Sequence, residues 1–108
     1  MSTIVHFDIP AENIERAKQF YSALFDWKFA SFPEMQYHLI TTTDLAGAPG
    51  VGGGMGKRMD PSQRVTNYYG VTSIVSGKMA VPTMGYLANC IDTEGNPFGL
   101  WEEDAGAK

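Results

Sequence analysis

The opening of the chain has the apolar pattern of a strand with two unlike faces. Residues 4–9 are apolar except for His6 and Asp8, and we expect Pro10 to end the strand. Because successive strand side chains point to opposite faces, His6 and Asp8 share one face. The alternation puts the other set towards a covering helix: Val5, Phe7 and Ile9.

The next segment changes to a helical period. Asn13 is a candidate N-cap, and the helix is expected to end near Asp26, which tolerates the left-handed conformation. Strands are then predicted over residues 27–32 and 35–42, separated by a turn at Pro33 and Glu34. The apolar residues with helical spacing are Ile14, Ala17, Phe20 or Tyr21, and Leu24.

Residues 50–57 are rich in glycine and must be compared with phosphate-binding loops. The P-loop pattern needs glycine where Val51 stands and serine or threonine where Arg58 stands, and the dinucleotide fingerprint fails at its last glycine. We therefore predict a glycine-rich strand that allows close approach of a ligand or another backbone. Residues 61–63 form a linker, and residues 65–71 start a second strand-led unit.

The end of the chain has the pattern of a β-hairpin. Residues 86–91 are largely apolar, residues 92–96 supply Asp, Gly and Asn for a reversal, and residues 98–102 extend again.

Three segments together resemble the glyoxalase/bleomycin-resistance/extradiol-dioxygenase superfamily, also called vicinal oxygen chelate. They are the opening Ile4-Val5-His6-Phe7-Asp8-Ile9-Pro10, the helix 16–21 ending in Leu24-Phe25-Asp26-Trp27, and the hairpin 86–102. The resemblance implies an α+β fold in which two βαβββ modules form an incomplete barrel around a cavity. We expect a single domain over residues 1–108, with modules at about 1–58 and 64–104.

The second module departs from this pattern. A helix is expected between Val71 and the hairpin, but residues 72–79 are too few to contain one. Either the module is truncated, or a helix-bearing segment is missing from the chain. We favour a missing segment, which predicts a chain break between about Ile74 and Ser76.

The resemblance also implies where a divalent metal would bind. The first-strand ligand falls on His6, but the remaining ligand positions fall on residues 52–54, on Thr66 and on Gly99. Glu102 has the opposite strand parity from Gly99. We therefore predict no tightly bound metal cofactor, with a metal site as the alternative.

The inward face instead suggests a small-molecule pocket. Aromatic walls with a few convergent polar groups are typical of such sites. The alternative is that His6 is a hydrogen-bonded interior histidine and Trp101 a core residue. If there is catalysis, His6 beside Asp8 is the candidate catalytic residue. The predicted pocket residues are His6, Asp8, Tyr68, Gly99 and Trp101.

Charge and length exclude several partners. The 108 residues carry a net charge of -4 with only 8 basic residues, which argues against nucleic acid. No apolar run approaches the ~20 residues of a membrane span, and the start of the chain lacks a signal-peptide pattern. We expect a cytoplasmic protein with no membrane partner.

Three functional hypotheses remain. The first is a glyoxalase/bleomycin-resistance-like protein that binds a small organic molecule without a metal. The second is an enzyme, either a metal-dependent lyase, isomerase or dioxygenase or a metal-free acid–base catalyst. The third is a structural or regulatory subunit that uses sheet edges and the methionine-rich residues 55–59 for association. Unpaired sheet edges also predict a homodimer.

Overall fold

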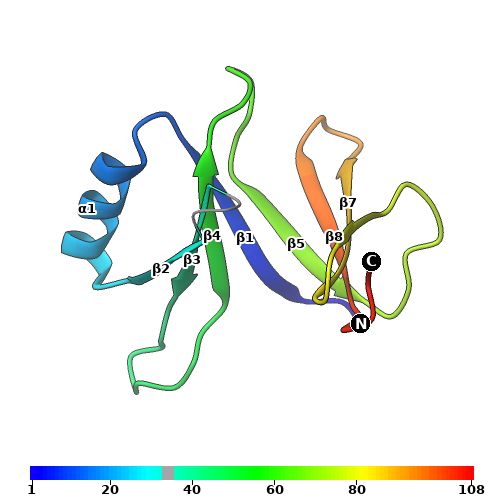
Figure 1. The fold of residues 1–108 in the computed structure, drawn as a ribbon, viewed down its shortest axis with the longest axis horizontal. Helices are drawn as coiled ribbons and strands as arrows, with labels where there is room; N and C mark the ends of the chain where they lie inside the picture. Colours follow the sequence, from blue (N-terminus) through cyan, green and yellow to red (C-terminus); the bar gives the residue numbers. More distant parts are fainter. Residues whose placement is uncertain (33–35) are drawn as a thin grey trace. The chain divides into compact units, whose positions relative to one another are not determined.

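The computed structural model describes residues 1–32 and 36–108, which form one helix and eight strands (Figure 1). The predicted turn at Pro33 and Glu34, and the predicted strand start at Met35, lie outside the described residues. The α+β class is confirmed. In chain order the elements are β1 (Ile4–Ala11), α1 (Ile14–Phe25), β2 (Lys28–Phe32), β3 (Tyr37–Thr41), β4 (Gly52–Lys57), β5 (Thr66–Val71), β6 (Met79–Val81), β7 (Gly85–Ile91) and β8 (Pro97–Glu103).

The chain divides into two compact units. The N-terminal unit is His6–Val65, and the C-terminal unit combines Met1–Val5 with Thr66–Lys108. In the described residues no helix is long and apolar enough to cross a membrane.

The N-terminal unit is a sheet with the strand order β2-β3-β4-β1, in which β4 pairs parallel with β1 and the other pairs are antiparallel. β1 continues through Pro10 to Ala11, so the prediction that Pro10 ends the strand is wrong. Pro10 lies opposite Gly56, and the carbonyl of Ala11 accepts a hydrogen bond from the Arg58 backbone at 2.9 Å.

Both ends of α1 form as predicted. The Asn13 side chain accepts a hydrogen bond from the Arg16 backbone at 3.0 Å, and Asp26 adopts the left-handed conformation with φ 56°. Of the two alternatives at the third helical position, Tyr21 packs against the core and Phe20 is exposed. The centre of that core is formed by Ile9, Ala11, Ile40 and Met55.

The methionine-rich stretch is only partly on the surface. Met55 is 0% exposed and lies in β4 under α1, whereas Met59 is 84% exposed. The hypothesis that residues 55–59 form one association surface is therefore wrong for Met55. Strand alternation explains this, because Met55 is on the core face of β4, opposite Ile9.

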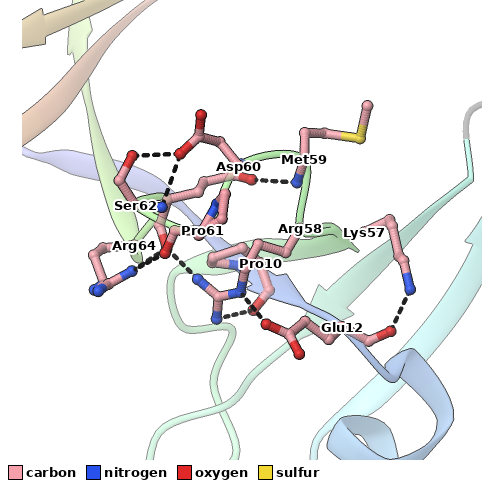
Figure 2. Close-up of polar contacts among 10 residues, drawn as sticks. Pro10, Glu12, Lys57, Arg58, Met59, Asp60, Pro61, Ser62 and Arg64 are labelled. Atoms are coloured by element: carbon pink, nitrogen blue, oxygen red, sulfur yellow. Dashed lines mark hydrogen bonds and ion pairs between the residues drawn. The ribbon is translucent and has the colours of Figure 1, made fainter.

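Arg58 joins three segments where β4 ends. Its guanidinium donates to the carbonyl oxygens of Gln63 and Pro10 and lies 3.6 Å from a carboxylate oxygen of Glu12 (Figure 2). The Lys57 ammonium donates to the Glu12 carbonyl at 2.5 Å. Lys57 and Arg58 both bind neighbouring protein groups, which supports the rejection of a phosphate-binding loop.

The C-terminal unit contains the predicted hairpin. β7 and β8 pair antiparallel from Gly85↔Glu103 to Ile91↔Pro97, β6 adds to β7, and β5 pairs parallel with β8. In the turn, Asp92 accepts hydrogen bonds from Asn96 and from the Glu94 backbone. The bonds from Asn96, first from its backbone, hold the pKa of Asp92 below its usual range.

No second helix occurs in the C-terminal unit, all of which is described. A loop of residues 72–78 connects β5 directly to β6 (Figure 1). The missing segment predicted between about Ile74 and Ser76 stays a prediction, with a truncated second module as its alternative. The loop buries Ile74, which is 4% exposed, and the Ile74 backbone donates to the Glu102 carboxylate at 2.8 Å. The Lys78 ammonium lies 4.2 Å from the centre of the Tyr86 ring.

Candidate functional site

Three polar side chains meet on the face of the N-terminal sheet away from α1. His6 Nε2 lies 3.0 Å from Asp8 Oδ1 and 2.9 Å from the Tyr37 hydroxyl oxygen. The Tyr37 hydroxyl donates a short hydrogen bond to the same oxygen of Asp8. All three side chains are partly buried, and we call them the His6–Asp8–Tyr37 cluster.

Strand alternation places His6 and Asp8 as predicted. Phe7 and Ile9, the intervening residues of β1, pack with the core under α1. His6 and Asp8 therefore project from the opposite face, where the two side chains contact each other directly. Whether they contact a ligand stays a prediction.

Glycines in β4 make the space for Tyr37. Tyr37 lies opposite Gly56 in the β3–β4 pair, and its ring extends over Gly54, which lies opposite Asp8. A Cβ atom at position 54 would lie 1.6 Å from the Tyr37 hydroxyl oxygen, which is far inside van der Waals contact. The predicted close approach to the glycine-rich strand therefore exists, but a side chain of the same unit makes it.

The remaining predicted pocket residues belong to the C-terminal unit. The Tyr68 ring packs over Gly99, where a Cβ atom would lie 2.1 Å from the ring, and the Tyr68 hydroxyl donates to Asn89 Oδ1 at 3.2 Å. The Trp101 ring covers Gly85, and its Nε1 donates to Glu103 at 2.5 Å. The structure thus brings Tyr68 and Gly99 together, just as it brings His6 and Asp8 together.

The residues at the ligand positions that the resemblance implies do not fit a bound metal ion. Gly54 and Gly99 carry no side-chain donor, and aromatic rings fill the space beside both. Glu102 is directed to the opposite face, as its parity predicts, and its carboxylate accepts from Ile74 and lies 3.7 Å from Lys78. Across residues 1–32 and 36–108, no group of three or more His, Cys, Asp or Glu side chains could hold a metal ion.

A shallow hollow lies on the other face of the N-terminal sheet, beside the first turns of α1. It is lined by residues of β1 and α1 and by Arg58, and none of the predicted pocket residues lines it. The hollow is therefore separate from the His6–Asp8–Tyr37 cluster, since β1 has the cluster on its opposite face.

Sequence reasoning missed Tyr37 and Asn89. Alternation in residues 37–41 could have placed Tyr37 and Leu39 on one face, but only the register with β4 shows that this face also carries Asp8. The glycines of β4 gave no side-chain period from which that register could be deduced.

Residues 3–43 match the model of a family described as bleomycin resistance protein-like N-terminal. No curated protein matches the chain. A superfamily member of the glyoxalase/bleomycin resistance protein/dioxygenase type from Vibrio splendidus has TM-score 0.66 and 10% identity, over 96% of this chain and 100% of that chain.

Two further solved structures have the same fold. A hypothetical protein from Bacillus halodurans gives TM-score 0.63 and 11% identity, over 99% of this chain and 98% of that chain. A variant of methylmalonyl-CoA epimerase from Streptomyces coelicolor, in complex with 2-nitronate-propionyl-CoA, gives TM-score 0.58 and 12% identity, over 94% and 97%. At these identities the likeness is one of fold.

The chain is an α+β protein whose fold matches that of the glyoxalase/bleomycin resistance protein/dioxygenase superfamily member. The family match over residues 3–43 and the fold both support the resemblance of this chain to the glyoxalase/bleomycin resistance protein/dioxygenase superfamily.

Proposed function

We propose that the chain binds a small organic molecule without a chelating metal, and that the His6–Asp8–Tyr37 cluster supplies the polar contacts. The observation that carries the proposal is the mutual contact of three partly buried polar side chains on a face where β4 offers mainly glycine. Ligand sites typically combine a few convergent polar groups with aromatic surface. The family match to a bleomycin resistance-like model supports binding as the activity.

The cluster offers Asp8 Oδ2 as an acceptor for a ligand. Both hydrogen bonds to Asp8 end on Oδ1, so a ligand hydroxyl or amine is expected to donate to Oδ2. A hydrogen bond to a charged group is worth about 1.5–3 kcal/mol, which corresponds to roughly tenfold to a hundredfold in affinity. For the C-terminal unit we propose, separately, that Tyr68, Gly99 and Trp101 contact a ligand.

The test is a thermal-shift screen of small aromatic and polar compounds in the presence of EDTA, followed by calorimetry. Asp8→Asn is expected to weaken any hit by about tenfold or more, because the carboxylate becomes a neutral amide. Asp26→Asn is the matched control, since Asp26 is exposed at the end of α1 and asparagine tolerates its conformation. Hits that need added metal, or that bind equally to Asp8→Asn, would contradict the proposal.

Acid–base catalysis is the second candidate, and one observation favours it. His, Asp and Tyr are all side chains that hold or move protons, and here they are in contact. A ligand with an acidic C–H bond should then exchange that hydrogen with deuterium oxide when bound. Exchange that persists in His6→Ala would exclude His6 as the catalytic residue, and a ligand that never exchanges would leave binding as the function.

We also propose a homodimer in the cytoplasm. β2 is an end strand of the N-terminal unit, and β6 is an end strand of the C-terminal unit. Unpaired strand edges invite association. Light scattering of the purified chain is expected to give twice the chain mass of 11.8 kDa. A monomer mass at high concentration would overturn the dimer.

A further inference from the structure

The hydrogen atoms of the His6–Asp8–Tyr37 cluster can be assigned by counting donors. A carboxylate only accepts hydrogen bonds, and a tyrosine hydroxyl has one hydrogen to donate. That hydrogen goes to Asp8 Oδ1, so the Tyr37 oxygen can only accept from His6. With Asp8 ionised, His6 Nε2 faces two acceptors at 3.0 Å and 2.9 Å, and the assignment that satisfies both places a proton on Nε2.

If His6 Nε2 carried no proton, hydrogen-bond acceptors would face each other in the cluster. If Nε2 had a lone pair and Tyr37 donated to it, Nε2 would face the Asp8 carboxylate oxygen with no hydrogen between them. The short contact between Tyr37 and Asp8 would also lose its hydrogen. Both contacts would then be repulsive.

We infer that the Tyr37 hydroxyl takes the place of a metal ion at His6. A histidine binds a metal through the lone pair of a deprotonated ring nitrogen, whereas here Nε2 keeps its proton and donates it to Asp8 and Tyr37. A metal could reach Nε2 only by removing that proton and both hydrogen bonds. His6 is thus a hydrogen-bond donor held in one orientation, and Tyr37 is the residue that positions it.

Because residue 54 is glycine, the Tyr37 ring can lie beside His6, and a metal ligand at position 54 is excluded at the same time. The resemblance implies a metal ligand within residues 52–54, but any side chain at position 54 would overlap the Tyr37 ring. A donor at position 54 and the present position of Tyr37 cannot coexist. The inference concerns the site of the proposed function, and it further predicts that a ligand is recognised by hydrogen bonds and needs no pair of chelating oxygens.

Long-range proton–nitrogen NMR of the histidine rings tests the inference without any ligand. The chain has only 2 histidines, so His6→Gln assigns the His6 signals against those of His38. In mildly alkaline buffer, His6 Nε2 is expected to give the signal of a protonated nitrogen. Equimolar zinc should leave that signal in place.

Two variants and two matched controls assign the effect to Tyr37. Tyr37→Phe removes only the hydroxyl and should shift the His6 signals, whereas Tyr86→Phe in the C-terminal unit should not. Gly54→Ala should cause a similar shift although Tyr37 is intact, because its Cβ displaces the ring. Gly52→Ala is the matched control on the same strand, since its Cβ has no contact closer than 3.6 Å.

An unprotonated Nε2, or zinc-induced loss of the His6 signals in the unmodified chain, would overturn the inference. So would His6 signals that are unchanged in both Tyr37→Phe and Gly54→Ala. These outcomes are independent of the ligand screen: the ring signals are readable even if no ligand is found, and binding can persist if the assignment fails.

Discussion

Replacing Met55 with alanine is expected to lower the free energy of unfolding by about 2–5 kcal/mol, the range measured for large-to-small changes in protein cores. Met55 is fully buried and packs in the same core as Ile9 and Ile40 under α1. The loss combines the transfer free energy of the removed atoms with the cost of the cavity left behind. Urea denaturation followed by circular dichroism measures it.

Met59→Ala is the matched control, because this methionine is 84% exposed and lies two residues after Lys57, where β4 ends. Its effect is expected to stay within about 0.5 kcal/mol, as for most surface substitutions. Equal effects of the two substitutions would show that Met55 is not a core residue.

Local alternation was sufficient to predict the polar face of β1. His6 and Asp8 alternate with Phe7 and Ile9 along β1. Because strand side chains point to the two faces in turn, placing Phe7 and Ile9 under the helix puts His6 and Asp8 on the opposite face. The hairpin was equally predictable. Asp92 and Gly95 supply the side-chain acceptor and the positive φ that its turn requires.

The partner of this polar face was not predictable, because it depends on the pairing of distant strands. Tyr37 contacts Asp8 across 29 positions of sequence, and the pairing of β3, β4 and β1 brings them together. Gly54 has no side chain that could indicate its face. Its role is visible only as the space that the Tyr37 ring fills.

The missing helix shows how a tertiary contact can replace an expected element. The sequence correctly excluded a helix in residues 72–79. A single buried side chain, Ile74, anchors the loop that stands in the helix's place in the chain. Nothing in the local pattern of residues 72–78 distinguishes Ile74 from the neighbouring Val75, which is 95% exposed.

Ile74→Asp is therefore expected to have the other large effect on stability, about 3–5 kcal/mol. The change removes a buried apolar side chain and introduces a carboxylate in its place. The backbone of this residue donates a hydrogen bond to the Glu102 carboxylate, so a second carboxylate is added near the first. A buried charge without a partner is costly, and a second negative charge beside Glu102 adds repulsion. Thermal and urea unfolding should both show the loss.

Val75→Asp is the control, since it introduces the same charge one residue further along the loop at an exposed side chain. It should change stability by no more than about 0.5 kcal/mol. The loss in Ile74→Asp should also shrink as the pH falls, because burial raises the pKa of the introduced carboxyl and its protonation relieves the charge. If both variants unfold alike, or if neither is destabilised, the loop is not anchored by Ile74, and another contact must hold residues 72–78 in the place of the second helix.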